Sequence, residues 1–310
     1  MFALLKKSAA AKGRIGITVD GGGIAVAVVT RAADQAQLQR CEVLPVDPSA
    51  GADAVADVVR DAGLPRLPVS MVLRAEDYQL ALVEAPDVPP AELRAAMRWR
   101  LKDAIDFRVE DAIIDVFDVP AQNRGGHGRM MYAVAARRGA VERCSTALAS
   151  LPGFDVVDVP ELCLRNIAAS LSAATTGVAL VHFGEAAASV ILVRGPTFYF
   201  ARQMSLRQAQ PRSGDGDGQA DSDGIVLELQ RSLDYYERHF DQPPITRIAI
   251  TPGGQRALDV TQALKRDTSF EVTALDLNSL LACAAPVEPQ TQAACLMAVG
   301  AAMREEHRSL

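Results

Sequence analysis

The sequence has no residue pattern typical of a zinc site or of a disulfide framework. Its four histidines are far apart and lack the short, regular ligand spacing that tetrahedral metal sites use. Its odd number of cysteines includes no CxxC pair: Cys41, Cys144, Cys163, Cys283 and Cys295. Four of them lie in apolar or helical stretches, which predicts buried, reduced thiols of a cytosolic protein.

Long hydrophobic runs and an excess of positive charge are also missing. No apolar segment reaches the roughly 20 residues that span a bilayer. The net charge is −6 and the arginines are scattered, so we expect no nucleic-acid partner. The first seven residues lack the apolar core and cleavage site of a signal peptide. So short a basic-apolar tip would bind an anionic membrane only weakly.

The chain contains one β-turn-β pattern twice. Its 310 residues are 49% hydrophobic, enough for about two domains. Residues 14–29 and 177–193 each predict a strand, a glycine-rich turn and a second strand. Alignment places Val19 on Val181, Asp20 on His182, Gly22 on Gly184 and Val28 on Val190. The repeat predicts a duplicated domain with its ligand between the halves; the alternative is two unrelated hairpins.

A helix-plus-sheet unit is predicted to be inserted into the first half at about 80–150. Its helix over 91–105 places apolar residues on one face at helical spacing, and Trp99 lies at the edge of that face. We interpret Trp99 as a packing anchor, and the alternative is a contact with a partner protein. The glycine-rich segment 121–129 does not open a helix, so it predicts a hairpin tip rather than a phosphate-binding loop.

In the second half, residues 208–224 predict a flexible surface loop, because Gly, Ser and Asp dominate them. Their spacing does not match the ligand order of an EF-hand, which is the alternative. A helix is expected over 225–240, with Asp223 as its N-cap. A helix over 291–305 contains Gly300, which predicts the close approach of another element or of a ligand.

Three glycine turns, the duplicated hairpin and the α/β background resemble the actin-like ATPase fold, which is a duplicated ribonuclease H-like fold. More specific motifs resemble the PilM family of type IV pilus assembly proteins and cover essentially the whole chain outside 208–224. These motifs are Leu93–Phe107, Val109–Val116, Val134–Arg137, Asp158–Glu161, Leu227–Tyr236 and Ala298–Ala301. Within this family the short, non-spanning chain is most similar to the MshI type, which belongs to mannose-sensitive haemagglutinin (MSHA) pilus biogenesis.

The resemblance implies an actin-like lobe I over 1–172, with the inserted α/β subdomain at about 80–150. It implies a lobe II over 173–310, with the flexible loop 208–224. It further implies a cytoplasmic scaffold, peripheral to the inner membrane, in the pilus assembly platform. Such a protein binds the short cytoplasmic tail of a PilN-like, here MshJ-like, membrane protein in a groove between the first subdomain and the inserted one. A homo-oligomer is left open.

ATP hydrolysis in this fold needs two carboxylate-bearing turns, which position Mg²⁺ and the attacking water, and a glycine turn near the adenosine. The candidate nucleotide-binding residues lie on three turns: Asp20, Gly21, Gly22 and Gly23 on the first, His182 and Gly184 on the second, and Gly253 and Gly254 on the third. Relatives carry an acid on the second turn, where this chain has His182.

A histidine does not replace a carboxylate beside Mg²⁺, because neutral imidazole is a softer ligand and imidazolium repels the metal. We therefore expect no catalytic residue, but a pseudo-ATPase with weak or vestigial binding of ATP and Mg²⁺. A purely structural interpretation makes His182 a partly buried imidazole, hydrogen-bonded across an empty cleft, and makes Asp20 a turn residue. The rival hypothesis is an active actin-like ATPase or small-molecule kinase, since fold does not decide function. A filament-forming protein has little support.

Overall fold

The structure, a computed structural model of the chain, describes residues 12–32, 35–47, 51–122, 128–149, 151, 153–172, 176–184, 187–205 and 217–305. Its first sheet starts with an antiparallel meander of β1 (Lys12–Asp20), β2 (Gly23–Ala32) and β3 (Gln35–Leu44). β4 (Val69–Val72) and β8 (Phe154–Asp158) continue it in parallel, and the short β14 (Ala282–Cys283) adds to the edge at β3. Helices α1 (Ala52–Asp61) and α3 (Arg138–Leu148) pack against each other beside this sheet.

The second sheet repeats this arrangement. β9 (Gly177–Phe183), β10 (Ala187–Arg194) and β11 (Thr197–Ser205) form the antiparallel meander, and β12 (Arg247–Ile250) and β13 (Glu271–Ala274) lie parallel to β9. Its helices are α5 (Asp217–His239) and α6 (Gly254–Asp267), followed by the short α7 (Leu277–Leu280) before β14. Both halves therefore run through three antiparallel strands and two parallel ones in the same order, which confirms the predicted duplicated α/β fold.

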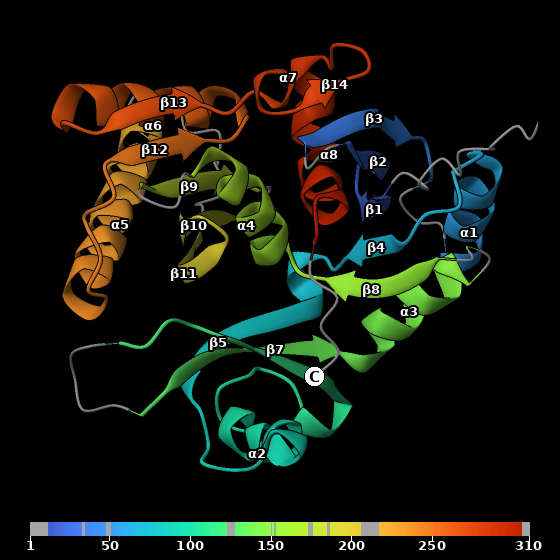
Figure 1. The fold of residues 1–310 in the computed structure, drawn as a ribbon, viewed down its shortest axis with the longest axis horizontal. Coiled ribbons are helices and arrows are strands. Elements are labelled where there is room, and N and C mark those ends of the chain that lie inside the picture. Colours follow the sequence, from blue (N-terminus) through green and yellow to red (C-terminus); the bar gives the residue numbers. More distant parts are fainter. Residues whose placement is uncertain are drawn as a thin grey trace, which may run out of the picture.

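Each half ends in a helix that covers the sheet of the other half. α4 (Pro160–Leu171) packs on β9, β10 and β11, whereas α8 (Pro289–Ala302) packs on β1, β2, β3 and β4. The two helices also contact each other between the sheets (Figure 1). A Cβ on Gly300 would collide with the carbonyl of Cys163, and one on Gly16 would collide with the carbonyl of Ala298. The predicted close approach at Gly300 is confirmed.

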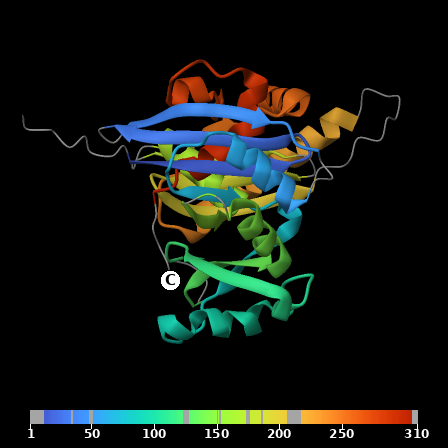
Figure 2. The same cartoon turned by 90° about the vertical axis from the view of Figure 1, so that its right-hand side faces the viewer.

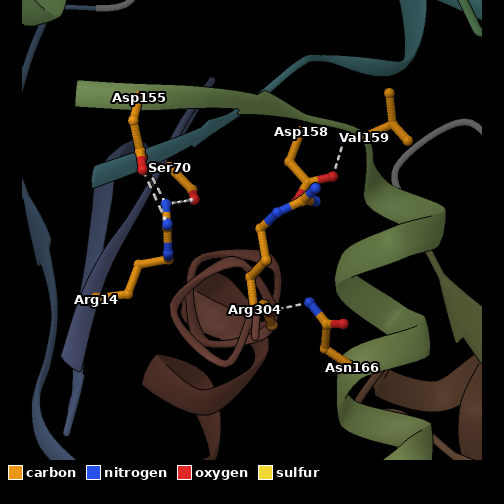
Figure 3. Close-up of polar contacts among 8 residues, drawn as sticks. Arg14, Ser70, Asp155, Asp158, Val159, Asn166 and Arg304 are labelled. Atoms are coloured by element: carbon orange, nitrogen blue, oxygen red, sulfur yellow. Dashed lines mark hydrogen bonds and ion pairs between the residues drawn. The ribbon is translucent and has the colours of Figure 1, made fainter. Parts of the chain in front are cut away.

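Buried polar contacts hold this central region together (Figure 3). The Arg14 guanidinium on β1 donates to Ser70 at 2.7 Å and to Asp155 at 2.6 and 3.0 Å, and so ties β1 to β4 and β8. Asn166 on α4 donates to the carbonyl of Gly300 at 2.8 Å. Arg304, just after α8, donates to Asp158 at 2.8 Å. Because buried charges are costly unless they are paired, these contacts fix the register of the elements that they join.

The inserted unit lies between β4 and α3 in the chain. It contains β5 (Tyr78–Glu84), α2 (Pro90–Leu101), β6 (Ala112–Asp118) and β7 (Met130–Arg137), with short 3-10 turns at Ala75–Asp77 and Val109–Asp111. The strands form an antiparallel sheet in the order β5-β7-β6. α2 buries Met97 and Leu101 against this sheet, at the end of the molecule farthest from β3 (Figures 1 and 2).

Two local predictions are wrong. Residues 217–224 are not part of a loop, because α5 begins at Asp217, and Asp223 is inside the helix rather than at its N-cap. Acidic residues in the first turns of a helix are favoured by its dipole, which the loop prediction neglected. Trp99 is no packing anchor, since its side chain is 79% exposed. Residues 208–216 lie outside the described residues, and the lobe boundaries at 172 and 173 stay predictions.

Candidate functional site

The first candidate turn joins β1 to β2. The Oδ1 atom of Asp20 accepts a hydrogen bond from the Gly22 amide at 2.8 Å, which makes Asp20 the residue that stabilises its own turn. Gly23 has φ +133°, a conformation that favours glycine. Asp20, Gly21 and Gly22 are exposed. The turn therefore presents a carboxylate to solvent at the carboxyl end of β1, which runs parallel to β4.

The second candidate turn joins β9 to β10. His182 precedes the last residue of β9, and its Nδ1 atom lies 3.1 Å from Oγ1 of Thr251 at the end of β12. The expected hydrogen bond across a cleft is therefore wrong, because Thr251 follows a neighbouring strand of the same sheet. Although the ring keeps partial access to solvent, burial by the atoms around it lowers the pKa of His182 to about 4. The imidazole is neutral at physiological pH.

The third candidate turn leads from β12 into α6 and packs on the second. A Cβ on Gly253 would lie 2.7 Å from the Cβ of Phe183, so only glycine lets these two turns approach. Gly254 has φ +62° with open space around it. Gly184 closes its own turn through an amide hydrogen bond to the Ala187 carbonyl at 2.9 Å. Among the described residues, no hydrogen bond or ion pair joins these two turns to Asp20.

The donor set on these turns does not fit Mg²⁺. A hard cation prefers carboxylate oxygens, but the first turn offers one carboxylate, Asp20, and the second offers a neutral imidazole already engaged with Thr251. Within the described part of the chain, no group of three or more histidine, cysteine or acidic side chains is arranged to hold a metal ion.

A buried carboxyl group that sequence reasoning missed lies next to this region. Glu161, in the first turn of α4, is 2% exposed and accepts hydrogen bonds from the hydroxyl of Tyr78 at 2.6 Å and from the Gln203 amide at 3.2 Å. Gln203 pairs with Ser189, which pairs with His182, so these three side chains share one face of the second sheet. Burial raises the pKa of Glu161. Its sequence signal was an acid three residues after the end of β8 and next to the proline that starts α4.

Glu161 lines a pocket of about 450 Å³, here called the polar pocket. The inserted unit contributes Tyr78, Gln79 and Arg137 to its wall, and the second sheet contributes Ser189 and Gln203. Arg137 lies 3.2 Å from Asp106 and stacks over the Phe107 ring with 4.2 Å to the centroid. Arg137 is therefore paired within the chain, and the polar pocket lies where the inserted unit meets the second sheet.

A second pocket, of about 400 Å³, is more apolar and is here called the β6 groove. Leu93, Val116 and Phe117 of the inserted unit form one wall. Residues from the end of β8 to the first turn of α4 and from the start of β11 line the rest of the groove: Val157, Val159, Leu162 and Phe198. Asp115, Asp118, Arg129 and Arg304 supply both signs of charge around these apolar residues.

The β6 groove follows an open sheet edge. β6 is the terminal strand of the sheet β5-β7-β6, and among the described strands it pairs with β7 alone. Side chains already engage two backbone groups of β6, because the Ala112 carbonyl accepts from Arg98 at 3.3 Å and the Val116 amide donates to Asp115 at 3.0 Å. The other backbone groups of the unpaired edge are available to an additional extended segment. An apolar groove beside such an edge has the chemistry to bind an extended peptide, with main-chain hydrogen bonds for affinity and pockets for alternate side chains.

The helices of the chain were also compared with the requirements of a membrane span. In the part that the structure describes, no helix combines the length and hydrophobicity needed to cross a membrane.

Comparisons with known proteins give structural relatives only. No protein-family model matches the sequence, and a search of curated proteins finds no match. The solved PilM-PilN type IV pilus biogenesis complex contains a chain that is 18% identical, with a TM-score of 0.66 over 94% of this chain and 99% of that one. A protein with an actin-like ATPase fold from Bacteroides thetaiotaomicron is 11% identical, with a TM-score of 0.52 over 92% of this chain and 96% of that one. This chain therefore has the actin-like ATPase fold.

Proposed function

We propose that this protein is a scaffold of type IV pilus biogenesis that binds the cytoplasmic tail of a PilN-like inner-membrane protein. The observation that carries the proposal is the match to a chain of the PilM-PilN complex, which extends over 94% of this chain and nearly all of that one. The inserted unit is included in this span. Scaffold function also agrees with the donor set of the glycine turns, which lacks the second carboxylate for Mg²⁺.

The β6 groove is the proposed binding site for the tail. It lies between the inserted unit and residues of both halves, from β8 and α4 to the start of β11 and Arg304, and β6 contributes to one wall. Leu93 on α2 and Leu162 on α4 offer apolar side chains to the tail. Asp115 and Arg129 are already paired with Arg94 and Asp118, so the proposal relies on apolar packing rather than on free charges. A tail that docks here in extended form contacts both subdomains at once, so tail binding depends on their relative placement.

A synthetic peptide with the sequence of a partner's cytoplasmic tail tests this site. We expect it to bind the purified protein in isothermal titration calorimetry. Leu93→Asp should weaken binding at least about tenfold, because a carboxylate in an apolar wall loses packing and is desolvated. The matched control is Leu258→Asp on α6, where the side chain is already 56% exposed. Equal affinity for both folded variants would place the tail elsewhere, and no binding to the unmodified protein would exclude the scaffold proposal.

The finer proposal is that the protein is of the MshI type and acts at the cytoplasmic face of the inner membrane in the MSHA system. It predicts that a tail from an MshJ-like protein binds more tightly than a tail from a PilN-like protein. Both peptides are therefore compared in the same titration. Preference for the PilN-like tail would keep the scaffold function but reject the MSHA assignment.

The nucleotide site is proposed to be degenerate. With one carboxylate at Asp20 and a neutral His182, we expect neither Mg²⁺-dependent ATP binding in the micromolar range nor turnover. Equilibrium titration with ATP, with and without Mg²⁺, together with a phosphate-release assay, measures both properties. Turnover that disappears in Asp20→Ala would instead establish the rival function, an active ATPase.

A further inference from the structure

The outer face of α2 carries the most exposed large apolar side chain among the described residues. This side chain is Trp99, which is 79% exposed and is the single tryptophan of the chain. The opposite face of α2 packs on the inserted sheet, where Met97 and Leu101 are completely buried. Figure 2 shows α2 as the outermost element at this end of the molecule. A second molecule can therefore reach Trp99 without displacing any described element.

Trp99 belongs to a stripe of four residues that runs along α2. The stripe consists of Glu92, Ala95, Trp99 and Lys102, which follow one another at intervals of three, four and three residues and are all exposed. Lys102, at the C-cap, keeps helical backbone angles. These intervals are the ones at which two paired helices face each other in a coiled coil. The small Ala95 leaves room for an indole ring from a second helix.

The order of residues in the stripe fits a second copy of the same helix in the antiparallel direction. Trp99 and Ala95 are equally far from the position of Met97 along the helix, and the same holds for Glu92 and Lys102. A two-fold axis at this position places each Trp99 on Ala95 of the second copy. The same axis places each Glu92 beside Lys102 of the second copy. Such an interface is isologous, so each favourable contact occurs twice.

The charges at the two ends of the stripe select this direction. The side chains of Glu92 and Lys102 form no ion pair or hydrogen bond with another residue that the structure describes. In a parallel pair each of them would face its own kind, and facing like charges oppose association. In an antiparallel pair each faces the opposite charge. The stripe is therefore complementary to itself in one orientation only.

We propose that the stripe on α2 is the contact surface of a homodimer, in which two copies pair antiparallel through Trp99. A contact confined to one helix buries less than the roughly 1,200 Å² of a standard interface, so the dimer is weak and dissociates on dilution. Leu93, which lines the β6 groove, lies on a different face of α2. Pairing therefore leaves this groove open. The dimer does not depend on the proposed function, under which it would carry two tails.

Sedimentation velocity and tryptophan fluorescence test the dimer on the full chain over a series of concentrations. Since Trp99 is the only tryptophan, its emission reports this face alone. We expect the sedimentation coefficient to rise with concentration. Over the same range the emission should shift to shorter wavelength and become less sensitive to acrylamide. A monomer at every concentration up to about 1 mM, or a dimer with unchanged Trp99 emission, would overturn the proposal.

Charge reversal tests the direction of pairing. Glu92→Lys should weaken association about tenfold, because two attractive pairs become repulsive. The double variant Glu92→Lys with Lys102→Glu should restore association, because opposite charges face each other again. Arg100→Glu is the matched control, since Arg100 is exposed on the same helix but outside the stripe. Circular dichroism establishes that each variant is folded, and a double variant that stays as weak as the single one would overturn the antiparallel pair.

The contribution of the indole ring is tested separately. Trp99→Ala should weaken association at least about tenfold, because a tryptophan at the centre of an interface contributes a large share of its binding energy. Leu258→Ala is the control, since it removes an exposed apolar side chain from α6. Equal association of the two variants would overturn the proposal. Vesicles of phosphatidylglycerol that shift the Trp99 emission of the dilute monomer would overturn it in favour of membrane binding. None of these measurements uses the tail peptide, so their failure would leave the proposed function intact.

Discussion

At the second glycine turn, the environment of one side chain, His182, is well defined. His182 occupies the end of β9, where its ring contacts Thr251 and its pKa is lowered to about 4 by burial. A neutral imidazole in this position stabilises the junction of β9 and β12 but offers little to a hard cation. His182 therefore contributes to packing between β9 and β12, and under the proposed function it occupies the position of the second carboxylate.

The depressed pKa of His182 predicts a pH dependence of stability. In the unfolded chain a histidine gains its proton near pH 6.5, whereas in the folded protein it does so near 4. Protons therefore favour the unfolded state, and stability falls as pH drops from about 6.5 to about 4. Denaturant unfolding at a series of pH values should show this loss reduced in His182→Asn, which keeps a polar group beside Thr251. An unchanged pH dependence in the variant would show that other groups cause it.

The sequence predicted the residues of the three turns but not their connections. Asp20 and the glycines were recognisable because a turn needs particular backbone conformations. The contact of Gly253 with Phe183 and the hydrogen bonds of Glu161 come from strands and helices far apart in the chain. No local pattern encodes such pairs, so the polar pocket and the β6 groove could only be found in three dimensions.

At the scale of single elements, α2 shows why a helical pattern does not settle which residues are buried. Met97 and Leu101 are completely buried against the inserted sheet, while Trp99, between them in sequence, points outward. A side chain two positions from a buried residue lies on a different face of the helix. The size of Trp99 suggested packing, but its position on the helix placed it in solvent.

This arrangement predicts opposite effects for two neighbouring substitutions in α2. Met97→Ala removes a fully buried side chain and should lower the free energy of unfolding by about 2–5 kcal/mol. Trp99→Ala removes an exposed side chain and should change it by less than about 0.5 kcal/mol. Urea denaturation followed by circular dichroism compares them. A large loss for Trp99→Ala would mean that another molecule or another copy covers this face in solution.

The wrong prediction of a loop over residues 217–224, where α5 begins, has a different cause from the wrong prediction for Trp99. Residues 208–224 have a loop-like composition, yet the helix already begins at Asp217. Composition averages over a window, whereas a helix boundary depends on the few residues in its first turns. The apolar residues that follow, such as Leu229 and Leu233, are buried in the largest hydrophobic core. This burial stabilises a helix whose first residues alone would not form one.

At the scale of the whole molecule, the crossing of α4 and α8 connects the fold to the proposed function. α8 lies on the first sheet and α4 on the second. The N-cap and the first turn of α4 supply Val159 and Leu162 to the β6 groove. Arg304, which follows α8, lines the same groove and holds Asp158. The groove is therefore built on the helix pair that joins the two halves.

Gly300 provides the sharpest test of this connection. A Cβ there would collide with the Cys163 carbonyl, so Gly300→Ala must separate α4 from α8, and we expect a loss of about 1–3 kcal/mol in unfolding free energy. Since the separation displaces the wall of the β6 groove, the affinity for the tail peptide should fall as well. Gly21→Ala is the control, because no atom lies within 4 Å of its added methyl group. Thermal unfolding and calorimetry measure both properties, and a Gly300→Ala protein that is less stable but binds the tail normally would show that the groove does not depend on the crossing.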